Sequence, residues 1–243
     1  MAITTLCFDF GNTRLKYGVF EGRNFVEEVF LENGSVEAIT EVLVKYQPQK
    51  TILSSVVNHD PQIETLLAQR SKFHLLGADT KMPITVPSGN AETIGADRLA
   101  LLMGAINETP DQHNLIVGLG SCITYNFINK FNQFLGGSIS PGLQMRFKSM
   151  HDFTAKLPLQ TPDWNFPLVG YDTRTNLLSG VILGMSKEID GIVDAYAEKY
   201  SKFNVFMTGG DMKFFLPHLK NKITADPNLL YKGLYAFSEV NNI

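Results

Sequence analysis

The most restrictive feature of the sequence is a layout that occurs twice. An apolar run over residues 3–10 reaches a tight turn at Gly11-Asn12 and continues as a second strand-like run. Residues 114–125 have the same layout, with Gly120 in the position of Gly11. A third strand-like run follows each copy. The pattern therefore predicts an internal duplication that produces two similar α/β domains facing each other across a cleft.

The two copies differ in charge at the turn. The first copy places a carboxylate, Asp9, at the end of its first strand, and Gly11 offers a backbone N–H without a Cβ. The hydroxyl of Thr13 follows, and Lys16 lies far enough along the chain to return toward the turn. These groups suit a phosphate and its metal ion, although the local pattern fits an ordinary β-hairpin equally well. In the second copy Gly118 stands in the position of Asp9, so the glycine turn is kept and the acid is missing.

The rest of the chain alternates between strand and helix patterns, as judged from apolar spacing, caps and breakers. The predicted strands are 3–10, 14–20, 24–31, 51–57, 114–119, 122–129, 133–139 and 203–207. The predicted helices start after Ser35 and Asp60, cover 96–106, 145–153, 173–199 and 232–240, and include one that starts near Asp211. Residues 77–93 and 157–170 are predicted to be irregular.

The helix over 96–106 opens with a charged motif, Gly95-Ala96-Asp97-Arg98. An acid in the first turn of a helix is favoured by the helix dipole. A simple helix-start charge would therefore explain Asp97 without any function.

Two pairs of glycines stand where another group could approach closely. Gly209-Gly210 follows a predicted strand and precedes a helix, which leaves room for a flat ligand or a phosphate chain. Gly180 and Gly184 lie four residues apart in the long predicted helix. They would let another helix approach, either within the same domain or from a partner.

Composition excludes several classes of protein. With 243 residues, 44% of them hydrophobic, the chain can bury a core, and a net charge of −3 provides no basic field for nucleic acid. Cys7 and Cys122 lie in apolar runs without metal spacing, which indicates reduced core thiols and a cytoplasmic location. No apolar run has the length of a membrane helix. The five histidines show no metal spacing, and Trp164 could line a substrate entrance or fix a loop.

Taken together, the motifs resemble those of the type III pantothenate kinases, which belong to the acetate-kinase, sugar-kinase and actin superfamily. Six motifs occur in the family's order, and this order replaces the hairpin and helix-start interpretations above. They are Asp9-x-Gly11-Asn12-Thr13-x-x-Lys16, Gly95-Ala96-Asp97-Arg98, residues 136–143, residues 154–158, Gly170-Tyr171-Asp172-Thr173 with Ser179-Gly180, and Thr208-Gly209-Gly210-Asp211.

The resemblance implies an α/β fold with two duplicated ribonuclease-H-like domains, as in the actin-like ATPases. The first domain, residues 1–112, would carry the first phosphate motif, and the second, residues 113–243, the second phosphate and adenosine motifs. The implied activity is ATP-dependent phosphorylation of pantothenate to 4'-phosphopantothenate, the first step of coenzyme A biosynthesis. The implied assembly is a cytoplasmic homodimer that binds neither nucleic acid nor membrane.

The resemblance also implies roles for single residues. Asp97 would be the general base, Gly95, Ala96 and Arg98 would bind pantothenate with it, and Thr173 would reach the substrate from the neighbouring subunit. The ATP and phosphate contacts would come from Asp9, Gly11, Asn12, Thr13, Lys16, Gly120, Ser121, Thr124, Gly209 and Gly210.

Metal ions are implied as well. Asp9 would hold Mg²⁺ with ATP, directly or through water, and family members generally also need K⁺ or NH₄⁺ near the second phosphate motif. The family pattern there resembles Asp-x-Gly-Thr-x-x-Thr-x-Asp, whereas this chain has Gly118 and Asn126 in place of the two acids. We therefore expect weaker or altered dependence on a monovalent cation.

Two other functions stay open at this point. The lost acids would also suit a non-catalytic, nucleotide-binding regulatory protein of the same fold. Another superfamily enzyme, such as a sugar kinase or a polyphosphate hydrolase, is the second alternative. The motifs at Gly95–Arg98 and Gly170–Thr173 favour pantothenate over these substrates.

Overall fold

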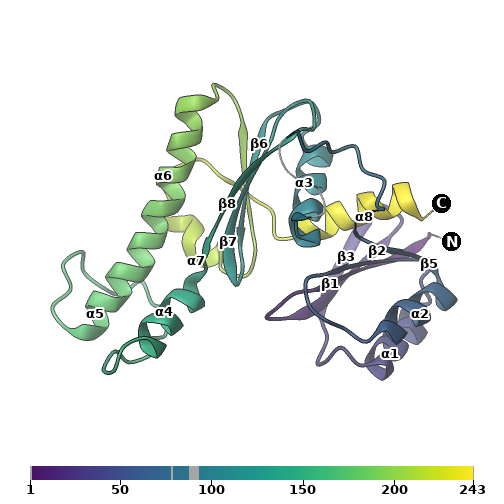
Figure 1. Ribbon diagram of the computed structural model, residues 1–243, viewed down its shortest axis with the longest axis horizontal. Helices are drawn as coiled ribbons and strands as arrows, with labels where there is room; N and C mark the ends of the chain where they lie inside the picture. The colour runs from purple at the N-terminus through teal and green to yellow at the C-terminus, as the bar shows by residue number, and fades with distance from the viewer. Residues whose placement is uncertain (1, 78, 88–92, 243) are drawn as a thin grey trace. The chain divides into compact units, whose positions relative to one another are not determined.

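The computed structural model describes residues 2–77, 79–87 and 93–242 (Figure 1). Ser88 and Gly89, which fall in the predicted loop over 77–93, lie outside the described residues.

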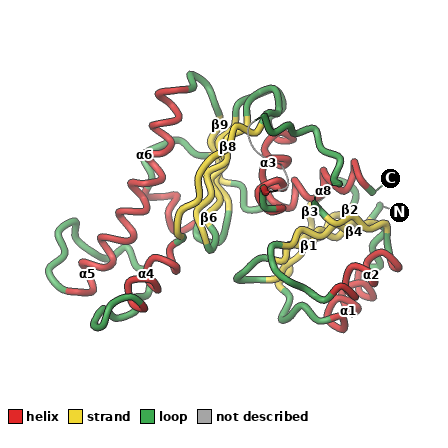
Figure 2. Tube along the Cα trace, viewed as in Figure 1, coloured by secondary structure: helices red, strands yellow, loops and turns green. Residues whose placement is uncertain are grey.

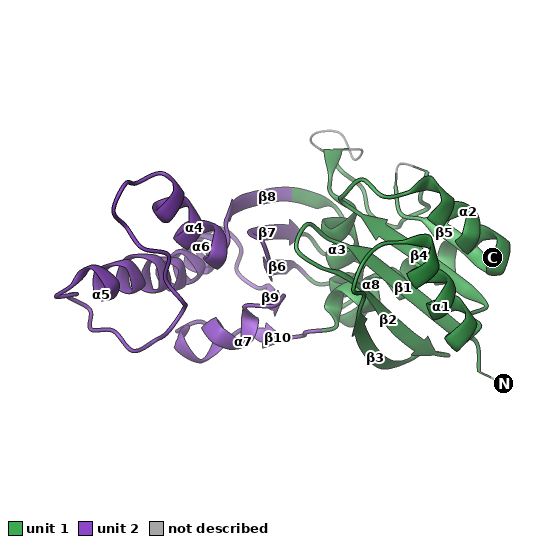
Figure 3. Cartoon of the chain, turned by 90° about the horizontal axis from the view of Figure 1, so that it is seen from below, with its two compact units in different colours: residues 1–112, 128–135, 228–243 green, residues 113–127, 136–227 purple. Residues whose placement is uncertain are grey.

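The chain divides into two compact units (Figure 3). Unit 1 consists of residues 1–112, 128–135 and 228–243, and unit 2 of residues 113–127 and 136–227. Unit 1 thus contains two segments that come after the predicted domain boundary at residue 112. The predicted cleft between the domains stays a prediction.

Unit 1 contains a mixed sheet, whose strands are drawn in yellow in Figure 2. The sheet is five-stranded, with the order β3-β2-β1-β4-β5. Its strands are β1 (Thr4–Phe10), β2 (Leu15–Glu21), β3 (Asn24–Phe30), β4 (Lys50–Ser55) and β5 (Lys72–Leu75). β2 pairs antiparallel with both β1 and β3, and β4 runs parallel to β1, so the predicted three-stranded meander is confirmed. β5 has no counterpart among the predicted strands, because its four residues are too few to show a periodic pattern.

The described residues of unit 1 form the α-helices α1 (Val36–Tyr46), α2 (Pro61–Arg70), α3 (Ala96–Glu108) and α8 (Leu229–Asn241). The first two start where their caps predict, because the side chains of Ser35 and Asp60 accept hydrogen bonds from backbone N–H groups of the first turn. α8 packs against α3 and starts three residues before its predicted first residue, Lys232.

The two faces of the first sheet have different partners (Figure 1). α1 and α2 cover one face, and the apolar core there is formed by Leu6, Phe8, Phe10, Tyr17, Val19, Ile39, Leu43, Leu53, Ile63 and Leu67. α8 lies on the other face, against β1, β2 and β4. Since successive side chains of a strand point to opposite faces, Asp9 and Lys16 lie on the α8 face.

Unit 2 is built around a second five-stranded sheet with the order β10-β9-β6-β7-β8. Its strands are β6 (Asn114–Leu119), β7 (Cys122–Ile128), β8 (Phe134–Pro141), β9 (Asn204–Thr208) and the two-residue β10 (Thr224–Ala225). β6 is parallel to β9. β6 and β7 are neighbours in the sheet and are joined by residues 120–121, so the strand–turn–strand layout of 114–128 is confirmed. The two residues of β10 are too few to leave a pattern in the sequence.

The helices of unit 2 are α4 (Leu143–Asp152), α5 (Thr173–Leu178), α6 (Gly184–Lys199) and α7 (Met212–Phe215). The long helix predicted over 173–199 is continuous, but its middle, Ser179–Leu183, is a π-helix that joins α5 to α6. Asp172 caps α5, because its carboxylate accepts a hydrogen bond of 2.7 Å from the N–H of Thr175. A 3₁₀ turn, Leu216–His218, follows the short helix α7.

The described helices include none that is long and apolar enough to cross a membrane.

Candidate active site

The first phosphate turn joins β1 to β2. Asp9 and Lys16 are direct partners in the antiparallel ladder, so their side chains leave the sheet on the same face. The turn is closed by a hydrogen bond of 3.1 Å from the N–H of Gly11 to the carbonyl of Arg14. Asn12 and Thr13 are exposed at its tip. The sequence-predicted residues of this motif therefore lie together.

Charge is concentrated beside this turn. Asp9 is buried at the end of β1, and the Lys16 ammonium lies 3.8 Å from its carboxylate and 3.3 Å from that of Glu28. Burial raises the pKa of Asp9 to about 6; Lys16 opposes this shift, and the charges of Asp97 and Glu28 add to it. Asp9 is thus a carboxylate whose negative charge is incompletely compensated by the protein.

Asp97 and Arg98 lie in the first turn of α3, which has Gly95 as its N-cap residue. Burial raises the pKa of Asp97, while hydrogen bonds from the backbone of Arg98 and its own N–H favour the charged form. The Arg98 guanidinium lies 5.5 Å from the ring centre of Phe134. A partly buried carboxylate with a raised pKa has the property that a general base needs.

A cavity of about 550 Å³ opens beside the first phosphate turn. It is lined by Gly11, Asn12, Thr13, Arg14, Leu15, Phe30, Leu31, Glu32 and Val57. The exposed backbone of the turn therefore borders space that a ligand can enter.

The second phosphate turn, between β6 and β7, also carries a glycine directly after its first strand, but it is shorter, because only residues 120–121 separate β6 from β7 whereas residues 11–14 separate β1 from β2. The N–H of Gly120 donates to the carbonyl of Cys122 at 3.0 Å, and the N–H of Gly142 donates to the carbonyl of Ser121 at 3.1 Å. Gly120 and Ser121 are exposed, and Thr124 is half-buried. The predicted second motif is therefore a surface turn that the segment before α4 supports.

The positions of the missing acids are occupied by neutral groups that fit the sheet. Gly118 is buried within β6, and the Asn126 amide donates to the Ile116 carbonyl at 3.4 Å and to the Thr124 hydroxyl at 3.2 Å. A carboxylate in place of that amide would set an acceptor against a carbonyl. These residues do not supply the anionic oxygen ligands of a monovalent-cation site.

The segment that contains Gly209 and Gly210 packs beside the second turn. The N–H of Asp211 donates to the carbonyl of Leu119 at 3.3 Å, so the strand-to-helix junction after β9 packs against the end of β6. Gly209 has φ = 103° and a Cβ there would collide with the Leu119 carbonyl, so only glycine fits this position. Sequence-distant parts of the predicted ATP site thus meet in unit 2.

Thr173 is the first residue of α5, and it is exposed. Gly180 and Gly184 are exposed on the helix that follows it, and a Cβ at either position would meet no heavy atom within 4 Å. Close packing of these glycines within the domain is therefore excluded for the described residues. The prediction that Thr173 serves a neighbouring subunit stays a prediction.

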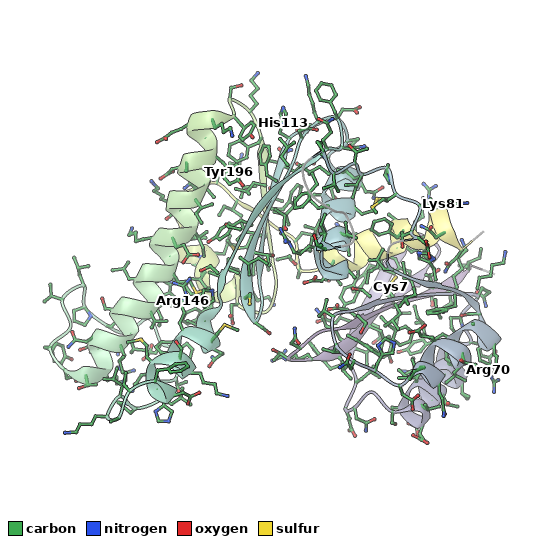
Figure 4. All side chains as sticks on the ribbon, viewed as in Figure 1. Cys7, Arg70, Lys81, His113, Arg146 and Tyr196 are labelled. Atoms are coloured by element: carbon green, nitrogen blue, oxygen red, sulfur yellow. The ribbon has the colours of Figure 1, made fainter. Side chains whose placement is uncertain are left out.

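Two groups of side chains near the predicted phosphate turns could not be predicted from the sequence patterns. In unit 1, Glu28 and Tyr231 complete the surroundings of Lys16. In unit 2, Arg146 on α4 (Figure 4) forms an ion pair with Glu188 and donates to the carbonyl of Pro141 at 2.7 Å. Glu188 lies 42 residues from Arg146, and Tyr231 lies 203 residues from Glu28, so no local spacing indicates these two pairs.

The other residues that the sequence analysis considered, Trp164, the two cysteines and the histidines, lie where they support the fold. The indole of Trp164 stacks on His218 at 3.7 Å and donates to the carbonyl of Phe214 at 2.8 Å, which fixes its irregular loop to α7. Cys7 is buried and both cysteines are free thiols. Among the described residues, no group of three or more His, Cys, Asp or Glu side chains is arranged to hold a metal ion.

Solved structures identify the class of fold. A Campylobacter jejuni protein assigned to the Baf family of transcriptional activators matches with a TM-score of 0.61 and 19% identity, covering 97% of this chain and 98% of that chain. A Listeria monocytogenes protein assigned as an N-acetylmannosamine kinase matches with a TM-score of 0.54 and 10% identity, covering 98% of this chain and 99% of that chain. A glucokinase from an Antarctic psychrotroph matches with a TM-score of 0.52 and 10% identity, covering 99% of this chain and 100% of that chain. The chain has the two-domain α/β fold of the actin-like ATPases and sugar kinases, as predicted.

Sequence comparison identifies the family within that class. The family model of type III pantothenate kinase matches residues 5–195. The type III pantothenate kinase of Christiangramia forsetii is 38% identical over 240 residues, which cover 97% of this chain and 98% of the relative. That of Bacteroides fragilis is 37% identical over 241 residues, with 98% of each covered. This chain belongs to the type III pantothenate kinase family.

Proposed function

We propose that this protein transfers the γ-phosphoryl group of ATP to the primary hydroxyl of pantothenate, the first step of coenzyme A biosynthesis. The observation that carries the proposal is the cluster of Asp9, Lys16 and Asp97 in unit 1, in a chain that belongs to the pantothenate kinase family over nearly its whole length. Phosphoryl transfer depends on positioning and charge neutralisation, and this cluster supplies a cation, a metal-binding carboxylate and a base.

The residues of unit 1 have separate roles in this proposal. The Lys16 ammonium and the backbone N–H groups of the turn at Gly11–Thr13 bind the phosphates. Asp97 accepts the proton of the pantothenate hydroxyl as that oxygen attacks phosphorus. The Arg98 guanidinium, with Gly95 and Ala96, binds an anionic or polar end of pantothenate.

Asp9 is the proposed ligand of Mg²⁺. The residue fits this ion because it is a hard oxygen ligand whose raised pKa reports an incompletely compensated negative charge. Bound with ATP, Mg²⁺ supplies neutralisation of the charge on the phosphates.

The second turn would bind the nucleotide without anionic side chains. Gly120, Ser121 and Thr124 offer backbone N–H groups and hydroxyls, and Gly209 and Gly210 leave room for the adenosine. K⁺ or NH₄⁺ would bind here weakly, since Gly118 and Asn126 replace the acids of the family pattern.

The proposed assembly is a cytoplasmic homodimer in which Thr173 contacts the substrate of its neighbour. The open face of the helix at Gly180 and Gly184 supports a place for that helix near the interface.

A coupled assay of ADP release tests the proposal. With ATP, Mg²⁺ and K⁺ present, we expect turnover that depends on added pantothenate. ATP binding without turnover on any alcohol would instead identify a regulatory nucleotide-binding protein. Turnover on a sugar but not on pantothenate would identify another small-molecule kinase.

A further inference from the structure

Strand β3 carries two neighbouring glutamates that each accept a hydrogen bond from a tyrosine. Glu27 faces α1 and accepts from the Tyr46 hydroxyl at 2.8 Å. Glu28 faces α8 and accepts from the Tyr231 hydroxyl at 2.7 Å. The two pairs are chemically alike and point to opposite faces of the same sheet, but only the Glu28 carboxylate also accepts a hydrogen bond from Lys16, at 3.3 Å.

Lys16 is held from three sides. Its ammonium lies 3.3 Å from Glu28 and 3.8 Å from Asp9, and 5.1 Å from the centre of the Tyr231 ring. An ammonium over an aromatic ring is attracted by the negative face of that ring. Tyr231 therefore acts on Lys16 twice, directly through its ring and indirectly through its hydroxyl on Glu28.

Tyr231 is itself fixed in place. Its side chain is fully buried, and its ring stacks on Phe25 with the ring centres 5.7 Å apart. A Cβ at Gly18, two residues after Lys16 and opposite Glu28 in the ladder, would lie 2.7 Å from the Tyr231 ring. The missing side chain at Gly18 thus makes the space that lets the ring lie against β2.

Charge balance explains what this arrangement does. Asp9 and Glu28 are the two carboxylates within 4 Å of the Lys16 ammonium in the described chain. If Glu28 lost its charge, Lys16 would pair with Asp9 alone, which would move the ammonium inward and neutralise the carboxylate. Both groups would then be less available to a nucleotide and its metal ion.

We propose that Glu28, fixed by the Tyr231 hydroxyl, is a positioning residue that holds the Lys16 ammonium between the Glu28 and Asp9 carboxylates and so prevents it from pairing with Asp9 alone. The inference rests on the role of Lys16 in the proposed function. Glu28 acts through Lys16 and not on the substrate.

The test compares each residue with its counterpart on the opposite face. Glu28→Gln keeps the shape and removes the charge, and we expect it to raise KM for ATP about 5- to 10-fold. Tyr231→Phe keeps the buried ring and removes the hydroxyl, with about a threefold increase expected. KM for pantothenate should stay within about twofold. Glu27→Gln and Tyr46→Phe are the matched controls, and both should match the wild type.

A double-mutant cycle shows whether Glu28 acts through Lys16. The dissociation constant of ATP is measured in EDTA, without pantothenate, for the wild type, Glu28→Gln, Lys16→Met and the double variant. We expect Glu28→Gln to weaken binding in the wild-type background and to have no further effect once Lys16 is replaced. Equal weakening in both backgrounds, or equal weakening by Glu27→Gln, would overturn the proposal.

Two further outcomes are informative. If Glu28→Gln fails to fold by circular dichroism, Tyr231→Phe replaces it in the same cycle. A wild type that binds ATP but does not turn over pantothenate would refute the proposed function and still allow the cycle to decide this inference. A wild type that binds no ATP would overturn both.

Discussion

The two phosphate turns both join two neighbouring strands through a glycine, but they differ in length and in charge. At the first turn, Asp9, Lys16 and Glu28 form a charged group on the α8 face of the sheet. At the second, Gly118 and the sheet-bonded amide of Asn126 occupy the equivalent region without any formal charge.

The difference separates what folding requires from what chemistry requires. The strand–glycine–strand scaffold satisfies backbone hydrogen bonds and fills a core, so both copies keep it. A buried carboxylate such as Asp9 costs stability, as its raised pKa shows. Such a group persists only where it does something other than stabilise the fold. In the proposed function, the charge-dependent steps therefore belong to the first turn.

Among the substitutions proposed here, Asp97→Asn should have the largest effect on turnover. Loss of the proposed general base should lower kcat by about 10²- to 10⁴-fold, while the dissociation constant of ATP changes little. Steady-state kinetics and equilibrium ATP binding measure the two quantities. Equal losses in kcat and in ATP affinity would show that Asp97 is not the general base.

Asp9→Asn should weaken Mg·ATP binding strongly and stabilise the ligand-free protein. Because the folded-state pKa of Asp9 is raised to about 6, its contribution to stability is full below its unfolded pKa and is lost as pH rises through about 6. Above that pH the neutral variant should therefore gain stability, by roughly 3 kcal/mol at most. Urea unfolding at pH 8 and at pH 4.5 measures this difference. A gain that does not shrink at the lower pH would contradict the explanation.

Acid should inactivate the enzyme by protonating the buried carboxylates of unit 1. In the proposed function, Asp9 and Asp97 both act in the ionised form, and burial raises the pKa of each. We expect kcat/KM for ATP at saturating Mg²⁺ to fall as pH drops through about 6. A pH profile that is flat down to pH 5 would show that neither carboxylate titrates in this range.

Changes at the second turn should have the smallest effects. In the wild type, K⁺ should stimulate turnover only weakly, because one anionic ligand contributes much of the affinity for a cation and this turn has none. Asn126→Asp should not create strong stimulation on its own, since its carboxylate would face the Ile116 carbonyl. Titration of activity with KCl in both proteins tests this. Steep activation of the wild type that saturates at low K⁺ would mean that other ligands hold the cation.

The sequence by itself determined most of the scaffold. The alternation of apolar residues, the caps at Ser35 and Asp60, and the glycine turns are local properties, and each predicts its element without tertiary information. The motifs at Asp9–Lys16 and Gly95–Arg98 indicated the family in the same way, because their residues are close in the chain. Short strands such as β5 and β10 left no periodic pattern.

Only the tertiary structure decided how these local pieces combine. It brought α8 back onto the first sheet, so that Tyr231 meets Glu28 across 203 residues of sequence, and it placed Gly209 against the end of β6. It also showed that the Asn126 amide belongs to the hydrogen bonding of its own sheet. Such contacts depend on which surfaces are buried together, and burial is a property of the whole fold rather than of any spacing along the chain.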